Sequence, residues 1–144
     1  INRKGLLHAT ADKQVDKIKL AYYSVQNCVA VFDDTLERIE RPALTVTCDK
    51  NTASFVYRNR TTGHNLIVLW DNSGIPGDAF GISLAQVVLG GLSIREPVWV
   101  DLVSGRIHAF PADRILTAGG STTFKDVPCY DAPVLLAEKE LMLR

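Results

Sequence analysis

Apolar residues recur at helical spacing in one segment near the start of the chain. Between Lys17 and Asp34 they form a single stripe, made up of Ile18, Ala21, Tyr22, Val25, Val29 and Phe32. Positions three and four residues apart share one face of an α-helix, so the pattern predicts a helix over 17–34. Leu20, Tyr23 and Val31 make other faces apolar too, and a helix of this kind usually packs between two bodies. The polar residues before it predict a loop.

Later in the chain the apolar positions change to a period of two, or form short continuous apolar runs, as in β-strands. The segments with these patterns are 43–49, 53–60, 64–71, 82–89, 96–103, 106–110, 122–127 and 132–139. Turn-forming residues separate most of them at intervals of roughly 8–12 residues, which is typical of a sandwich or a closed sheet. The predicted fold is mainly β: an antiparallel β-sandwich of about eight strands with one N-terminal α-helix.

Glycines mark the sharpest predicted turns. Thr61-Thr62-Gly63 separates two apolar segments and predicts a β-hairpin. Ser104-Gly105 predicts a two-residue hairpin turn with a positive φ at Gly105, because such turns commonly require it. Residues 71–78 predict a loop, and residues 111–115 predict a brief helical turn.

Composition limits the classes of protein that the chain can belong to. Its 144 residues suit one ordinary domain, and 47% apolar with 22% charged residues are typical of a soluble globular protein. Sixteen basic and sixteen acidic side chains balance, so nothing draws the chain toward nucleic acid or an anionic membrane. Apolar runs stay short of the roughly 20 residues that a membrane-spanning helix needs. We therefore expect neither nucleic acid nor a membrane as a partner.

Cysteine and histidine suggest no metal or redox site by their spacing. The cysteines, Cys28, Cys48 and Cys129, include no C-x-x-C pair, and we expect small inert apolar side chains, with a Cys28–Cys48 disulfide as the alternative. The histidines lie far apart and lack ligand spacing such as H-x-x-x-H. Glycine-rich phosphate-binding motifs and the nucleophile elbow are absent. We expect neither a metal nor a cofactor.

Carboxylates are the remaining candidates for catalysis, since glycoside hydrolysis uses a pair of them. The candidates are Asp33, Asp34, Asp71, Asp78, Asp101 and Asp131. Asp71 and Asp78 flank a Pro/Gly loop, and Asp101 precedes a tight turn, so turn formation explains them more simply than chemistry does. We assign no catalytic residue to this chain.

Aromatic side chains offer one further kind of site. Sugar rings stack on flat aromatic faces, and an exposed row of such faces would bind carbohydrate. The aromatic residues on strands or at strand ends are Tyr57, Trp70, Trp99 and Tyr130. Packing inside the fold or against another domain is the simpler expectation for them. Trp99 and Tyr130 are the two candidates for a carbohydrate contact.

Both ends of the chain resemble parts of one kind of enzyme. The helical segment has a K-x-A-Y-Y-x-x-Q-N pattern, formed by Lys19, Ala21, Tyr22, Tyr23, Gln26 and Asn27. It resembles the final barrel helix of TIM-barrel glycoside hydrolases that continue into a C-terminal β-sandwich. The stretches "VDLVSGRI" (100–107) and "FKDVPCYDAPV" (124–134) are similar to the closing hairpins of such sandwiches.

This resemblance implies a division of the chain and a role. Residues 1–36 would be the end of an upstream barrel domain, and residues 37–144 a β-sandwich accessory domain. The catalytic carboxylates of such enzymes sit on barrel strands, to which no position here corresponds, so the sandwich would be non-catalytic. It would buttress the barrel, which is its main partner. It could also help to bind polysaccharide. The resemblance also favours secretion or a periplasmic location, and without the barrel we expect self-association through the helix.

Two other functions stay open at this point. A self-standing carbohydrate-binding module would show a solvent-exposed row of aromatic side chains. A complete small hydrolase would need two carboxylates roughly 5–10 Å apart in a cleft. The helix itself also has a plainer interpretation, in which it covers one face of the sandwich.

Overall fold

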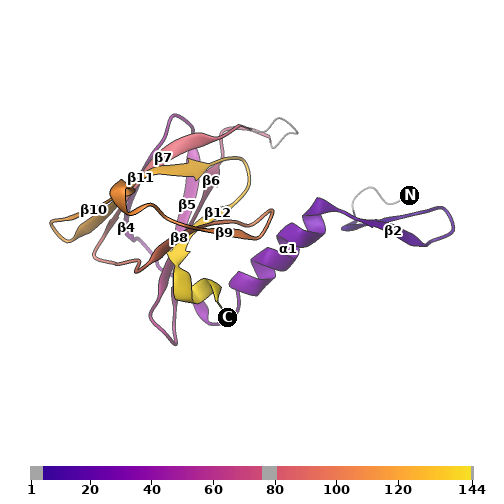
Figure 1. Cartoon of the computed structure of the whole chain (residues 1–144), viewed down its shortest axis with the longest axis horizontal. Helices are drawn as coiled ribbons and strands as arrows, with labels where there is room; N and C mark the ends of the chain where they lie inside the picture. The colour runs from indigo at the N-terminus through magenta and orange to yellow at the C-terminus, as the bar shows by residue number, and fades with distance from the viewer. Residues whose placement is uncertain (1–4, 76–80, 144) are drawn as a thin grey trace.

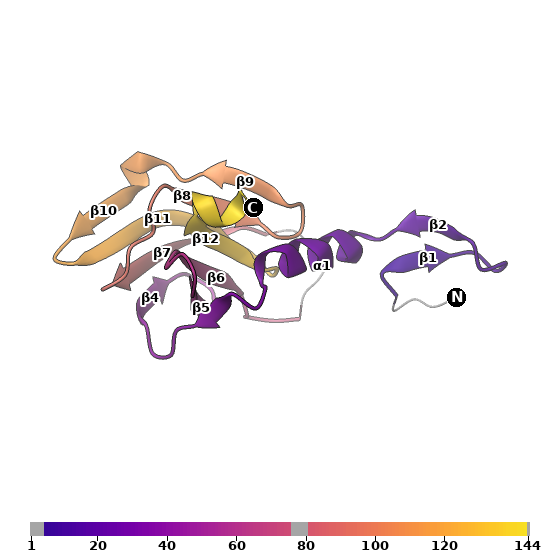
Figure 2. The ribbon, with the colours of Figure 1, turned by 90° about the horizontal axis from the view of Figure 1, so that it is seen from below.

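The computed structural model describes residues 5–75 and 81–143, and it shows a β-sandwich from which an N-terminal arm projects (Figures 1 and 2). The arm holds a two-stranded sheet of β1 (Leu7–Ala9) and β2 (Val15–Ile18), followed by helix α1 (Leu20–Val31). The sandwich consists of a four-stranded and a six-stranded sheet. Neighbouring strands are antiparallel in all three sheets. The predicted fold class is confirmed.

The four-stranded sheet has the order β10-β11-β7-β4. Its strands are β4 (Ala43–Thr47), β7 (Ser83–Gly90), β10 (Ile115–Ala118) and β11 (Ser121–Cys129). The six-stranded sheet has the order β3-β5-β6-β12-β8-β9. Its strands are β3 (Leu36–Arg38), β5 (Thr52–Asn59), β6 (Asn65–Asp71), β8 (Pro97–Asp101), β9 (Arg106–Ala109) and β12 (Val134–Glu138). Two 3₁₀ turns, η1 (Ala112–Arg114) and η2 (Lys139–Met142), follow β9 and β12.

All eight predicted strand segments form strands, and four shorter strands join them. β3 and β10 extend the edges of the two sheets, and each has too few residues to show a period. β1 and β2 occupy residues for which the sequence predicted mostly a loop. Their turn depends on local hydrogen bonds, in which the Thr10 amide and hydroxyl both donate to the Gln14 carbonyl oxygen, at 2.9 and 3.1 Å. Apolar periodicity cannot reveal a hairpin of this kind.

Helix α1 is shorter than the predicted 17–34 at both ends. Lys17 and Ile18 pair with His8 and Leu7 in the small sheet, which keeps them extended. At the other end the Asp33 carboxylate accepts hydrogen bonds from the amide (2.9 Å) and hydroxyl (2.5 Å) of Thr35, and this local turn replaces further helix.

The main core lies between the two large sheets. Alternate residues of β7 and β11 point inward, among them Val87, Leu89 and Phe124, and all three are fully buried. They meet Ile67, Leu69 and Leu136 from the six-stranded sheet. Phe110 packs edge-on against Phe124, with ring centroids 5.7 Å apart. This is the inward alternation that a sandwich requires.

A second apolar cluster covers the outer face of the six-stranded sheet. It contains Leu66, Val68, Val98, Val100, Leu102, Leu135, Ala137 and Leu141. The last turn of α1 and the 3₁₀ turn η2 lie over it, through Cys28, Val31, Phe32 and Met142. Strands β6 and β12 are therefore buried on both faces. This explains why their sequences are nearly continuous apolar runs and do not alternate between apolar and polar residues.

The turn after β8 confirms one prediction and corrects another. Gly105 has a φ of +72°, as predicted. The turn is not a two-residue turn, however, because Asp101 pairs with Arg106 and four residues lie between them. The Asp101 carboxylate accepts hydrogen bonds from the Val103 amide (2.8 Å) and the Ser104 hydroxyl (2.5 Å), and so supports the longer loop.

All three cysteines are free thiols, so the alternative Cys28–Cys48 disulfide is absent. Cys129 is buried in the main core, and burial raises its pKa to about 12. A thiol with such a pKa is almost wholly protonated at neutral pH and is a poor nucleophile. Cys129 therefore behaves as a small apolar core residue, as the sequence predicted.

Candidate functional site

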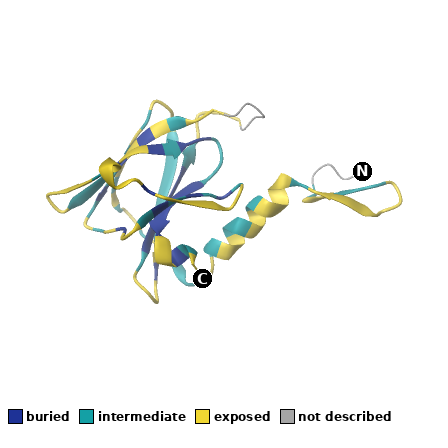
Figure 3. Cartoon of the chain, in the orientation of Figure 1, coloured by how far each residue is buried: buried dark blue, intermediate teal, exposed yellow. Residues whose placement is uncertain are grey.

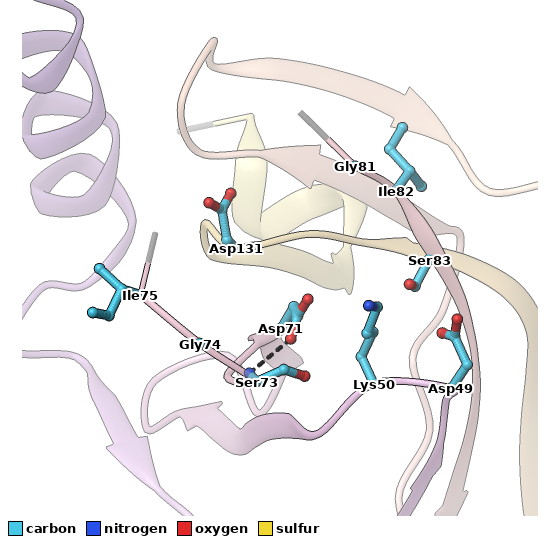
Figure 4. A pocket seen from close by; sticks show the side chains of 10 residues that line it. All are labelled: Asp49, Lys50, Asp71, Ser73, Gly74, Ile75, Gly81, Ile82, Ser83 and Asp131. Carbon is cyan, nitrogen blue, oxygen red and sulfur yellow. Dashed lines mark hydrogen bonds between the residues drawn. The ribbon is translucent and has the colours of Figure 1, made fainter. Parts of the chain in front are cut away.

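A hollow of about 520 Å³ opens at one end of the sandwich (Figure 4). Asp49 and Lys50 follow β4, Asp71 ends β6, and Asp131 lies between β11 and β12. The structure thus brings together two of the candidate carboxylates, Asp71 and Asp131, and adds Asp49, which sequence reasoning did not single out. Lys50 is the cation among them in Figure 4.

The electrostatics of this hollow suit turn formation better than acid catalysis. The Asp71 carboxylate accepts a hydrogen bond from the Ser73 amide at 2.8 Å, and hydrogen bonds from Ser73 lower its pKa. A hydrogen bond from Ser83, with a further one from Cys48, lowers the pKa of Asp49. A glycosidase acid instead needs a carboxyl whose pKa is raised. These two carboxylates are ionised hydrogen-bond acceptors at neutral pH.

The other candidate carboxylates do not join this group. The Asp33 carboxylate accepts a hydrogen bond from the Thr35 amide in the turn after helix α1, and the backbone carbonyl of its neighbour Asp34 accepts a hydrogen bond from Arg60. Asp101 organises the turn after β8. Asp78 lies outside the described residues. Within residues 5–75 and 81–143 no group of three His, Cys, Asp or Glu side chains is placed to hold a metal ion.

Tyr130, one of the two predicted carbohydrate contacts, is a core residue. Its side chain is 6% exposed and belongs to the main core cluster. Its hydroxyl donates a hydrogen bond to the Asp101 carboxylate, and burial, together with that partner, raises the pKa of the phenol. A ring buried to this degree offers no open face on which a sugar could stack. Through this hydrogen bond, Tyr130 links the loop before β12 to the turn after β8.

Trp99, the other predicted contact, lies beside a second hollow of about 310 Å³. The Trp99 side chain is half-buried, and its indole Nε1–H donates to the Pro128 carbonyl oxygen at 3.0 Å. The His108 ring from β9 lies next to it, with ring centroids 5.7 Å apart. Arg114 and Asp126 also line this hollow, and their Nε and Oδ2 atoms are 3.8 Å apart.

Sequence reasoning missed His108, Arg114 and Asp126 as members of a common site. One signal was available. Phe124 and Val127 are both apolar and three residues apart, which breaks the period of two inside a strand. The structure shows the corresponding irregularity in β11, where the pairing with β7 shifts between these residues.

Comparison of the chain with protein-family models, with curated proteins and with solved structures finds no match. A function for this chain therefore has to be argued from its own residues and their geometry. Among the described residues, no helix has the length and apolar character to cross a lipid bilayer.

We expect the purified 144-residue chain to hydrolyse no glycoside. Hydrogen bonds lower the pKa of Asp49, Asp71 and Asp101, so none of these three carboxylates is the acid with a raised pKa that a glycosidase needs. The measurement is release of nitrophenol from a panel of nitrophenyl glycosides, and of reducing ends from polysaccharides. Turnover that disappears in Asp71→Asn but survives in a control, Asp113→Asn, would contradict this expectation.

Proposed function

We propose that this chain is a non-catalytic accessory β-sandwich domain of a glycoside-hydrolase-like protein. In this proposal the arm, formed by β1, β2 and α1, docks against a neighbouring barrel domain, and the sandwich buttresses that barrel. The resemblance of the helix pattern and of the closing hairpins to such proteins suggests the partner. The observation that carries the docking role is the exposure of the arm's apolar side chains.

Within α1, all of which is described, no residue is buried. Its C-terminal half contacts the sandwich, where Cys28 and Val31 pack on the outer cluster and the Asn27 side-chain amide donates to the Leu102 carbonyl oxygen at 3.0 Å. The rest of the helix projects from the body, and Figure 3 shows this part mostly exposed. The plainer interpretation, a helix that lies flat on one sandwich face, therefore applies to its last turns alone.

The exposed part of the arm is apolar over several turns. Leu20 is 64% exposed and Val29 68%, and the other large apolar side chains exposed there are Leu6, Leu7, Val15, Ile18, Tyr22, Tyr23 and Val25. Leaving two such side chains in water forgoes a few kcal/mol of burial, at roughly 25 cal/mol per Å². So many exposed large apolar side chains on one short segment indicate a surface that a partner covers.

The test uses the 144-residue chain by itself. We expect concentration-dependent dimerisation in sedimentation-velocity runs, or binding of a hydrophobic dye, because the arm's apolar face is uncovered. The double variant Leu20→Gln/Tyr23→Gln should abolish that signal without lowering the thermal midpoint of the sandwich. The matched control is Leu84→Gln/Leu116→Gln, which removes two side chains that are each 55% exposed on the four-stranded sheet.

Two results would overturn the docking role. One is a monomer that binds no dye. The other is a Leu20→Gln/Tyr23→Gln variant that loses its β-sheet signal in circular dichroism, since that would make the whole helix part of the sandwich core. An equal loss of association in the control variant Leu84→Gln/Leu116→Gln would mean that the four-stranded sheet, and not the arm, forms the self-association surface.

A self-standing carbohydrate-binding module is the second candidate function, and the hollow beside Trp99 is the observation that favours it. In that case the arm would have no barrel to dock on. Binding of saccharide at this hollow is compatible with both functions.

A further inference from the structure

Side chains from four separate elements line the hollow beside Trp99. Trp99 comes from β8, His108 from β9, Arg114 from η1, and Asp126 and Pro128 from β11. Its volume of about 310 Å³ is at the lower end of the range for small-molecule sites. The site includes one of the two aromatic residues that the sequence selected for carbohydrate contact.

Trp99 is held as a fixed surface. The hydrogen bond from its Nε1–H to the Pro128 carbonyl oxygen, at 3.0 Å, sets the orientation of the indole ring. The His108 ring is tilted by 43° to it, so the two rings form an angled pair rather than a flat stack. A rigid aromatic surface binds the apolar face of a ligand with little loss of conformational entropy.

Asp126 is placed beside this surface by a strained backbone. Its φ is +54°, and it lies in the irregular part of β11, between Phe124 and Val127. A left-handed conformation costs a non-glycine residue free energy, although Asp tolerates it better than most. Bulges of this kind re-aim side chains and are common next to functional sites. A glycine would fit the backbone here at lower cost, so the backbone conformation by itself does not explain why this position is Asp.

The ion pair between Arg114 and Asp126 adds little to stability. Their side chains are 44% and 52% exposed, and their charged atoms are 3.8 Å apart. Pairs with such exposure and spacing contribute little to folding. Both groups therefore keep hydrogen-bonding capacity for a ligand: the guanidinium donates and the carboxylate accepts. Their charges cancel, which favours a neutral ligand over an anion.

We propose that this hollow binds one pyranose unit of a neutral polysaccharide. One face of the sugar ring stacks on Trp99 with its C–H bonds toward the indole, and the His108 ring borders it. Hydroxyl groups at the ring edge donate to Asp126 and accept from Arg114. A ligand with an apolar face and a rim of hydroxyls matches an aromatic surface bordered by a donor and an acceptor. The choice of a saccharide as ligand rests on the proposed accessory function.

The experiment is isothermal titration calorimetry of the 144-residue chain with soluble hexasaccharides at millimolar concentration. Five probes cover the common backbones: β-1,4-glucan, β-1,4-xylan, β-1,4-mannan, β-1,3-glucan and α-1,4-glucan. We expect binding of at least one of them. Asp126→Gly should weaken that binding about tenfold or more, because it removes a charged hydrogen-bond acceptor.

The variant Asp126→Gly also separates binding from folding. Glycine accepts a φ of +54° without strain, so the thermal midpoint should stay the same or rise. His108→Ala should weaken binding several-fold by the loss of one ring. The matched control is Asp113→Ala, which removes a carboxylate from the neighbouring turn η1 outside the hollow and should leave binding unchanged.

Absence of binding to all five probes would overturn the proposal, as would binding that Asp126→Gly and His108→Ala leave intact. The arm variant Leu20→Gln/Tyr23→Gln should not alter the affinity. A failure of saccharide binding and a failure of arm docking are therefore separate results.

Discussion

Replacement of Asp101 by Ala should lower the free energy of unfolding by about 3 kcal/mol. The Asp101 carboxylate accepts hydrogen bonds from the Val103 amide (2.8 Å), the Ser104 hydroxyl (2.5 Å) and the Tyr130 hydroxyl. The substitution removes an acceptor of the part-buried Tyr130 hydroxyl and two supports of the turn at once. Hydrogen bonds to a charged group are worth more than neutral ones, and a buried polar group that loses its partner is costly.

The pH dependence of the free energy of unfolding should show the same interaction at acidic pH. Burial alone would raise the pKa of Asp101, but hydrogen bonds from Ser104, Tyr130 and the backbone amides of Val103 and Ser104 outweigh it and lower the pKa. Because the pKa is lower in the folded state, the stability it contributes is complete above the unfolded pKa and is lost as the pH falls through the folded pKa. The difference between wild type and Asp101→Asn should therefore shrink in acid.

Urea denaturation at neutral pH is the measurement for Asp101→Ala. Tyr130→Phe alone should cost less, since it removes only the donor, and the double variant should cost less than the sum of the single ones. Asp113→Ala, which removes an exposed carboxylate from η1, is the control and should change stability little. A loss below about 1 kcal/mol for Asp101→Ala would mean that water replaces these hydrogen bonds.

Gly105→Val should cost about 2 kcal/mol or more and should loosen helix α1 as well. The φ of +72° already penalises any side chain with a Cβ. In addition, a Cβ at this position would lie 3.0 Å from Oδ1 and 3.1 Å from Nδ2 of Asn27 on the helix. That amide donates to the Leu102 carbonyl oxygen, so the substitution displaces the hydrogen bond that links α1 to the turn.

Gly120→Val is the matched control for Gly105→Val. Gly120 has a similar φ of +77°, but an added Cβ there would meet no atom within 4 Å. The difference in urea midpoint between the two variants isolates the contact with Asn27. Limited proteolysis should cut α1 faster in Gly105→Val than in Gly120→Val. Equal losses of stability and equal cleavage rates would show that backbone strain alone explains the effect.

Eight strands of the sandwich were predictable because their side chains alternate or, in β6 and β12, form a nearly continuous apolar run. The ends of helix α1 were not, because Ile18 has the right spacing for the helix and yet pairs with Leu7. Tertiary pairing overrides local periodicity at such a position. The short strands β3 and β10 have no periodic signal of their own and exist as additions to a sheet edge.

The candidate site was predictable only in part, for a related reason. Trp99 could be selected because sugar rings stack on flat aromatic faces, and it lies on a predicted strand. Asp126 could not, because its position depends on a backbone irregularity, and Arg114 becomes its neighbour only when η1 folds back beside β11. Tyr130 was selected by the same rule as Trp99, and burial gives it a different role. Residue type indicates what a side chain can do, while exposure decides whether it does so.

The position of β12 has a consequence for how the chain folds. It lies between β6 and β8 and is hydrogen-bonded to both, so it alone joins β3-β5-β6 to β8-β9 within the sheet (Figure 1). All five of its residues are buried. During synthesis the facing edges of β6 and β8 stay unpaired until residues 134–138 have left the ribosome. These exposed edges are the features by which nascent chains aggregate, and closure over such long sequence separations is slow.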